Sequence, residues 1–209
     1  SQMLSLEDIL KDKKARGTFG EFQLKKLISD VMPETSYAFE YTLSNQKRVD
    51  CILFLPEPTG NLAIDAKFPL ENYRKMHDSS LDEVQKKLAK NHFRQDLKKH
   101  ILDISEKYLI AGETAEGAIL FIPAESIFAE IHSQFCELVE EAYQKKVWLA
   151  SPSTLMAILT TSRAVIKDAD TRKQVHLIQA HLSDLAKDFE RFTKRMDQLK
   201  RHIEQAHQD

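Results

Sequence analysis

The sequence predicts an α/β protein in which a mixed β-sheet is flanked by helices and followed by a long, coiled-coil-like C-terminal helix. Its 209 residues are 42% hydrophobic and 30% charged, which is enough apolar material for one sizeable core beneath a solvated surface. Segments with the two-residue period of strands alternate with segments of helical period. After residue 174 the apolar residues follow heptads. These three observations define the expected architecture.

The first complete helix is expected between Thr18 and Pro33. Thr18 is a suitable N-cap, Glu21 follows three residues later, and apolar residues then recur at helical spacing until Pro33 ends the pattern. Residues 1–16 are expected to contain the end of another helix and a basic linker that reaches Gly17. We therefore expect the main domain to begin at residue 17.

Three strands are expected next, because apolar, β-branched and aromatic residues now alternate with turn signals. These strands cover residues 37–43, 48–55 and 62–67. The turn-rich segment 56–61 contains two prolines and a glycine and makes a hairpin of the second and third strands. With a loop of this length Leu55 pairs with Leu62, which places Asp50 opposite Lys67.

The second half of the main domain is expected to return to alternating helices and strands. A long helix, capped by Ser79 or Ser80, is expected to reach about Leu109. The elements that follow are a strand, a helix and a second short strand, at residues 118–122, 125–145 and 147–150. After Pro152 the chain is expected to be helical almost to its end. A sheet covered by helices is the fold that this order predicts.

The last helix carries the clearest periodicity in the sequence, and we expect a main domain over residues 17–168 and a heptad helix over residues 169–209. Its apolar residues are spaced alternately by three and four: Val175, Ile178, Leu182, Leu185, Phe189, Phe192, Met196, Leu199 and Ile203. Two interpretations are open: a helix that lies on its own domain, and a coiled coil that makes the protein a homo-oligomer. The flanking e and g positions offer little charge pairing, so the pattern leaves the orientation of any partner open.

Composition excludes several classes of protein. No run of eighteen apolar residues and no signal-peptide pattern occurs, so we expect neither a membrane span nor secretion, and a cytoplasmic location. The net charge of -2 provides no overall positive field, so binding to nucleic acid requires a local patch. The glycine motifs of nucleotide-binding proteins and serine hydrolases are absent. Cys51 and Cys136 lack zinc-site spacing and are expected to be reduced core residues.

The strongest indication of chemistry is a pair of acids and a lysine on the predicted hairpin. Asp65 and Lys67 point to one face of a strand because side chains alternate, and the expected pairing adds Asp50 to that face. Two adjacent carboxylates repel one another unless a cation lies between them, which indicates a divalent metal site. Oxygen ligands favour Mg²⁺ or Mn²⁺. A lysine beside such a site suits phosphodiester hydrolysis, because it orients the attacking water or balances phosphate charge.

The tripeptide Asp65-Ala66-Lys67, an acid two residues before a lysine, is not informative by itself. An acid two residues before a lysine occurs three times in this sequence, at residues 12–14, 65–67 and 96–98. Only the middle one ends a predicted strand and follows another acid across a hairpin. A salt-bridged Asp and Lys at a strand end is the structural alternative.

An ordered set of motifs extends this argument. In chain order they are G-x-x-G-E-x-x-L (residues 17–24), V-D-x-I-x-x-L-P (49–56), I-D-A-K (64–67), H-I (100–101), L-F-I-P-x-E (120–125) and L-x-S-P-[ST]-[ST]-L (149–155). The set resembles the RmuC family of bacterial DNA recombination proteins over roughly residues 15 to 170. The helices and strands of that family are similar to the restriction-endonuclease-like PD-(D/E)XK core, so the resemblance implies a fold of that kind.

The resemblance also implies a nuclease site. In the PD-(D/E)XK core a helical Glu, two strand acids and a Lys form the active site, so Glu21, Asp50 and Asp65 would bind Mg²⁺ or Mn²⁺ and Lys67 would be catalytic. DNA is the implied partner, since family members are linked to recombination and are predicted nucleases. Full-length members usually have an upstream coiled coil, often with an inner-membrane anchor. Val49 stands before Asp50 where the motif name has Pro, a departure common in this superfamily.

A basic helix is the second candidate for contact with DNA. Lys86, Lys90 and Arg94 form one i,i+4 row, Lys98 follows, and His100 lies one turn beyond. Such a row can track a phosphate backbone, and the alternative is a solvated helix face with a structural histidine. Two other functions remain open beside a nuclease: a non-catalytic module that binds DNA ends or branched DNA, and a coiled-coil assembly scaffold that limits recombination.

Overall fold

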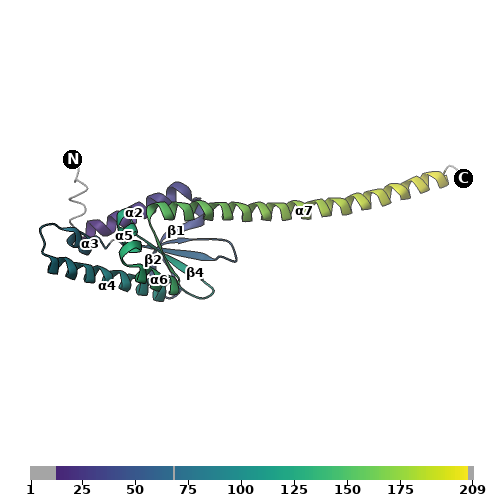
Figure 1. The fold of residues 1–209 in the computed structure, drawn as a ribbon. Helices are drawn as coiled ribbons and strands as arrows, with labels where there is room; N and C mark the ends of the chain where they lie inside the picture. The colour runs from purple at the N-terminus through teal and green to yellow at the C-terminus, as the bar shows by residue number, and fades with distance from the viewer. Residues whose placement is uncertain (1–12, 68, 207–209) are drawn as a thin grey trace. The chain divides into compact units, whose positions relative to one another are not determined.

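A computed structural model describes residues 13–67 and 69–206, and the chain divides into two units between Val165 and Ile166. The first unit holds a sheet with its flanking helices, and the second holds the remainder of the last helix (Figure 1). The described helices are α2 (Lys13–Val31), the 3-10 helix η1 (Glu34–Ser36), α3 (Leu70–His77), α4 (Glu83–Tyr108), α5 (Glu125–Gln134), α6 (Cys136–Gln144) and α7 (Pro152–Ala206). The described strands are β1 (Tyr37–Thr42), β2 (Arg48–Leu53), β3 (Asn61–Ala66), β4 (Thr114–Phe121) and β5 (Val147–Ala150).

The strands form one five-stranded mixed sheet in the order β1-β2-β3-β4-β5. The first three strands are antiparallel neighbours, whereas β4 pairs parallel to both β3 and β5. Figure 1 shows α4 and α6 on one side of this sheet and α2 on the other. The predicted mixed α/β sheet with flanking helices and a long C-terminal helix is therefore confirmed.

The core lies between the sheet and α4. Buried residues on α4 recur at spacings of three and four, from Phe93 through Leu97, Ile101 and Ile104 to Tyr108, so one face of this helix packs on the sheet. Each large apolar side chain buried in this way contributes about 1.5–3 kcal/mol. The same face carries Tyr108 to the end of the helix, where it reaches the acids described below.

The hairpin register differs from the prediction by two residues. Leu53, rather than Leu55, pairs with Leu62. The backbone N–H of Phe54 donates to Ser36 O at 2.8 Å and so continues the pairing of β2 with the chain before β1. The next position beyond the last pair therefore sets Asp50 opposite Asp65, and the prediction that it lies opposite Lys67 is wrong. A shift of two keeps every side chain on its expected face, so the acids still share one side of the sheet.

Several helix boundaries also differ from the prediction. Helix α2 already begins at Lys13, so the basic stretch expected to be a linker is helical where it is described, and Thr18 lies inside the helix rather than at its N-cap. The helix expected within residues 4–10 lies outside the described residues. Helix α4 is capped by Asp82, whose carboxylate accepts from the Gln85 N–H at 2.7 Å, rather than by either predicted serine.

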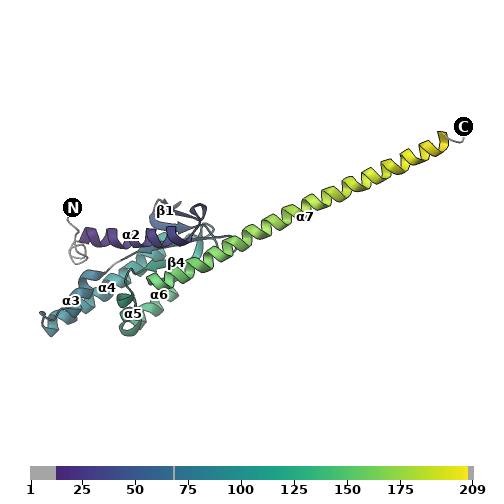
Figure 2. The same cartoon turned by 90° about the horizontal axis from the view of Figure 1, so that it is seen from above.

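Further differences concern the connections. Helix α3 was not predicted, and it lies beside α4 (Figure 2). The single helix expected over residues 125–145 is two helices, α5 and α6, that meet at Phe135. Phe135 is almost fully buried, so the chain bends there to place an aromatic ring in the core.

Cys51 is buried as expected, but Cys136 begins α6 and is exposed; both are free thiols. No described helix is long and apolar enough to cross a membrane.

Candidate active site

The sheet brings Asp50, Asp65 and Lys67 together at the ends of β2 and β3. Strand β3 is central in the sheet, between β2 and β4, and Asp65 near its end is only 2% exposed. The chain continues this pairing past the strand, since the backbone N–H of Lys67 donates to Phe121 O at 3.0 Å. The backbone of all three residues is therefore held by the sheet, and their relative positions are determined by it.

Direct contacts link these three residues. Lys67 Nζ lies 2.5 Å from Asp65 Oδ2, and the Asp50 carboxylate accepts a hydrogen bond from the Ala66 N–H at 2.7 Å. One acid is thus paired with a cation and the other with a backbone donor. The structure confirms that acids and lysine share a face, and leaves their chemical role a prediction.

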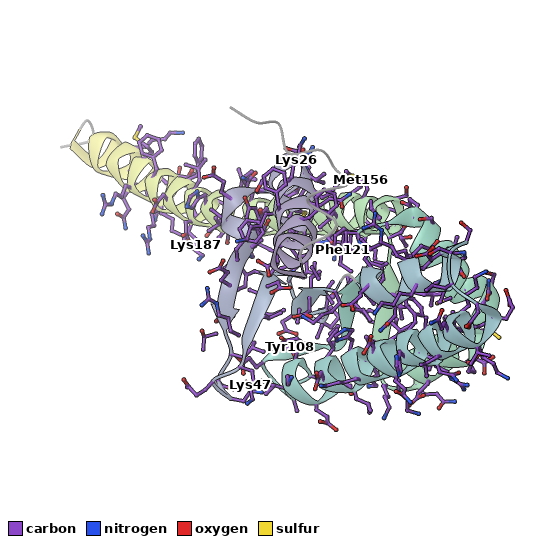
Figure 3. All side chains as sticks on the ribbon, turned by 90° about the vertical axis from the view of Figure 1, so that its left-hand side faces the viewer. Lys26, Lys47, Tyr108, Phe121, Met156 and Lys187 are labelled. Atoms are coloured by element: carbon purple, nitrogen blue, oxygen red, sulfur yellow. The ribbon has the colours of Figure 1, made fainter. Side chains whose placement is uncertain are left out.

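Tyr108 is a fourth member of this cluster, and sequence analysis missed it. Its hydroxyl, at the end of α4 beside the strands (Figure 3), lies 3.0 Å from Asp65 Oδ1 and 3.0 Å from Arg48 O. A phenol has one proton, so it donates to one of these oxygens at a time. The position of Tyr108 in the apolar repeat of the helix predicts burial, but nothing local predicts which acid it meets.

Burial and like charge shift the acid–base properties of the cluster. The pKa of Asp50 is raised from 3.8 to about 6, chiefly by burial and the Asp65 charge, although the Ala66 N–H and Lys67 oppose this. Burial alone would lower the pKa of Lys67, but the charges of Asp65, Asp50 and Glu21 outweigh it and raise that pKa. Lys67 is therefore held protonated among acids that outnumber it.

Glu21 acts on this cluster from a distance. It is exposed on α2, and its charge raises the pKa of both Asp50 and Lys67. Within residues 13–67 and 69–206, however, no three acidic, histidine or cysteine side chains lie close enough together to hold a metal ion. The structure thus brings two of the predicted ligands together and leaves Glu21 outside. The carboxylate oxygens of Asp50 and Asp65 match the donor set that Mg²⁺ or Mn²⁺ prefers.

His100 lies next to the cluster. Burial, followed by the Lys67 charge, lowers its pKa, and Asp96 and Asp65 oppose that shift. Its Nδ1 atom is buried and has no hydrogen-bond partner among the described residues. His100 therefore belongs beside the acids as a neutral imidazole, and not on the exposed row that precedes it.

Comparison with known proteins identifies the family. A model described as the RmuC family matches residues 1–209. The chain belongs to the RmuC family. Proteins named "DNA recombination protein RmuC homolog" are 31% identical over 97% of this chain in both Chlamydia trachomatis and Chlamydia muridarum, and 31% identical over 75% of it in Zymomonas mobilis. The chain spans 47%, 47% and 36% of these three relatives, about half of their length or less. No solved structure matches it.

Two of the RmuC motifs contact one another. Glu125, at the end of L-F-I-P-x-E, accepts a hydrogen bond from the Ser153 N–H at 2.7 Å, and Ser153 lies in L-x-S-P-[ST]-[ST]-L. Hydrogen bonds from the side chain and the backbone N–H of Ser153 lower the pKa of Glu125. Ile122 N–H also donates to Ala150 O at 2.8 Å. These two RmuC motifs thus join β4 and α5 to the start of α7, and the first of them begins at Leu120, which pairs with Asp65 in the sheet.

The predicted DNA-binding row of this RmuC chain lies against neighbouring helices. Lys90 donates to the Gln134 side chain at 2.7 Å, Arg94 lies 3.3 Å from Glu137, and Lys98 lies 3.0 Å from Glu141. Lys86 pairs instead with Glu83 on its own helix, at 3.3 Å. The row connects α4 with α5 and α6, and its positive charge is largely balanced. DNA binding by these residues stays a prediction.

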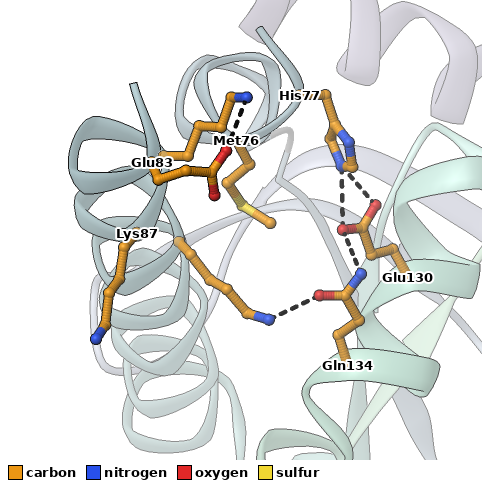
Figure 4. A pocket seen from close by; sticks show the side chains of 8 residues that line it. Met76, His77, Glu83, Lys87, Glu130 and Gln134 are labelled. Atoms are coloured by element: carbon orange, nitrogen blue, oxygen red, sulfur yellow. Dashed lines mark hydrogen bonds and ion pairs between the residues drawn. The ribbon is translucent and has the colours of Figure 1, made fainter. Parts of the chain in front are cut away.

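A cavity of about 470 Å³ lies at the N-terminal end of this row, between α3, α4 and α5 (Figure 4). His77 Nε2 lies 3.0 and 2.8 Å from the Glu130 oxygens, and Gln134 donates to Glu130 at 3.0 Å. Lys90 completes the chain through Gln134. The polar groups of this network pair with one another, so the network links α3, α4 and α5.

Proposed function

We propose that this RmuC domain is a metal-dependent DNA nuclease that hydrolyses phosphodiester bonds in DNA recombination. The observation that carries the proposal is the convergence of Asp50, Asp65 and Lys67 at the end of a central strand, with the pKa of Asp50 raised to about 6. Buried acids with perturbed pKa values are typical of functional sites. The name of the relatives, DNA recombination protein RmuC homolog, supports the choice of DNA and of recombination.

Asp50 and Asp65 are the residues proposed to hold Mg²⁺ or Mn²⁺, with Glu21 as the third acid that the PD-(D/E)XK resemblance implies. Such an ion supplies a Lewis acid that polarises a phosphoryl oxygen and lowers the pKa of coordinated water. The pKa of Asp50 is raised by burial and then by the charge of Asp65, and two acids beside one lysine form an environment that attracts another cation.

Lys67 is proposed to stabilise charge on the phosphate. Its pKa is raised, so it is protonated at neutral pH and offers N–H donors rather than a free base. It is also one-third exposed, whereas Asp65 beneath it is almost fully buried. The ammonium is therefore accessible to a phosphodiester as negative charge accumulates on the transferring oxygens.

A second candidate function is a non-catalytic module that binds DNA ends or branched DNA. It is favoured by the absence of a three-ligand cluster within the described part of the chain. It is also favoured by the partners of the acids, since Asp50 accepts from Ala66 while Asp65 meets Lys67 and Tyr108. Acids with these partners can serve architecture alone.

Cleavage of labelled single-stranded, duplex and branched DNA in Mg²⁺ or Mn²⁺ distinguishes these functions. We expect metal-dependent cutting that falls about 10²- to 10³-fold in Lys67→Ala and Asp65→Asn. Asp184→Asn is the matched control, because Asp184 pairs with Lys187 at 3.0 Å on α7 and should leave cutting unchanged. Calorimetric titration with Mn²⁺ gives a second result, in which Asp65→Asn loses binding and the control retains it.

The negative outcomes separate the candidates. No cutting of any DNA, with tight DNA binding retained by all variants, would overturn the nuclease and support the binding module. If the wild-type protein neither cuts nor binds any DNA, both proposed functions are overturned. Cutting that survives Asp65→Asn would place the activity elsewhere in the protein.

A further inference from the structure

The second unit exposes a continuous apolar stripe along α7. Its described members are 46% to 67% exposed: Val175, Ile178, Leu182, Leu185, Phe189, Phe192 and Met196. Contiguous apolar surface of this extent is unusual on a protein that has no partner, and marks an interaction surface. Its heptad spacing matches the seam of a coiled coil, with Phe189 at an a position and Phe192 at a d position.

We propose that this stripe pairs with the same stripe of a second copy of the chain, as an antiparallel two-stranded coiled coil. The charges beside the seam select this orientation. In a parallel pair each g residue faces the e residue of the next heptad, so Arg195 would face Lys200 and Asp188 would face Thr193. That arrangement has one repulsion and no attraction, and it therefore disfavours a parallel pair.

The antiparallel arrangement turns the same charges into attractions. When Phe189 of one copy lies opposite Phe192 of the other, Leu185 lies opposite Met196, and each layer combines an a with a d position. In this register the g residues face one another, and Asp188 meets Arg195 of the second copy. The two-fold axis repeats the contact, so the dimer gains two such pairs. Arg195 makes no ion pair within the described part of its own chain, whereas Asp188 lies 3.1 Å from Arg191 on its own helix, so the contact across the dimer adds a second cation to an exposed carboxylate.

A second copy is the occupant that this pattern fits. A two-fold interface uses the same patch on both partners, so a patch that pairs with itself must carry both charges at complementary positions. Asp188 and Arg195 meet this requirement on one side of a continuous apolar seam. The proposal depends on α7 alone and stands whether or not the acids cut DNA.

Sedimentation of the intact chain at several concentrations tests the dimer and its orientation together. We expect a dimer whose dissociation constant rises about tenfold in Arg195→Asp, because two attractive pairs become repulsive. Asp188→Arg combined with Arg195→Asp should restore the wild-type value. Lys194→Asp is the matched control, since it makes the same charge change at an f position that points away from the seam.

Two results would overturn the proposal. One is a monomer at every concentration. The other is tighter association of Arg195→Asp, because in a parallel dimer that change creates an attraction to Lys200. Disulfide trapping in a Cys136→Ser background adds a direct check: a mixture of Leu185→Cys and Met196→Cys should form a mixed disulfide. Leu185→Cys cross-linking to itself as readily would contradict the antiparallel register.

Discussion

Two groups of charged residues on this protein use similar side chains in different surroundings. Lys67 and Asp65 meet at the end of a central strand, where the acid is almost fully buried. Lys98 and Glu141 meet on the surface between α4 and α6, where the lysine is about half exposed. Solvent screens the second pair, whereas the first is coupled to further charges, and the pKa values of Asp50 and Lys67 are raised. Burial, more than residue type, marks the first group as the candidate site.

Replacing Lys67 with Met is the strongest test of this difference. We expect the free energy of unfolding to fall by about 3–4 kcal/mol at neutral pH, because removing one partner leaves Asp65 as an uncompensated buried charge. Urea denaturation measures the change. Lys98→Met removes a lysine from the exposed pair and is the control, and an equal loss in both variants would contradict the comparison.

The pH dependence of stability gives the next largest effect. Because the pKa of Asp50 is raised from 3.8 to about 6, the folded state binds the proton more tightly than the unfolded state. Ionising Asp50 therefore costs stability as the pH rises between these values, and protonation restores it. We expect metal-free wild type to lose about 2–3 kcal/mol relative to Asp50→Asn across this interval, and to change little above it. Parallel stability curves for the two proteins would show that Asp50 is not perturbed.

Tyr108→Phe should have an intermediate effect. It removes the hydroxyl that contacts Asp65 and Arg48 and keeps the ring, so we expect a loss of about 1–2 kcal/mol in the free energy of unfolding. If the nuclease proposal holds, cutting should fall as well, since Asp65 loses the group that orients it. Tyr143→Phe, on an exposed tyrosine, is the matched control in both assays. Equal behaviour of the two variants would remove Tyr108 from the cluster.

The row of basic residues on α4 that contains Lys98 should make the smallest contribution to stability. A double-mutant cycle on Lys98 and Glu141 is expected to yield a coupling below about 1 kcal/mol that high salt abolishes. Thermal or urea unfolding of the four proteins provides the measurement. A larger coupling that resists salt would show that the row behaves like the buried cluster.

Local patterns predicted much of the fold. The strand over residues 147–150 matches β5 at both ends, and the other strands overlap their predicted segments. Alternation along β3 correctly put Asp65 and Lys67 on one face, because the period of a strand does not depend on its partners. The break at Phe135 and the capping of α4 by Asp82 were missed, since burial and competing caps decided them.

The candidate site was predicted in part, because local periodicity predicts which residues share a face but not which distant residues they meet. The sequence by itself determined the alternation of strands and helices, the shared face of Asp65 and Lys67, the heptads of α7 and the motifs of the RmuC family. Only the tertiary structure decided that Asp50 faces Asp65, that Tyr108 reaches that acid, and that the basic row lies against α5 and α6. Periodicity is a property of neighbouring residues, whereas register and ion pairing across 43 positions depend on how distant segments pack.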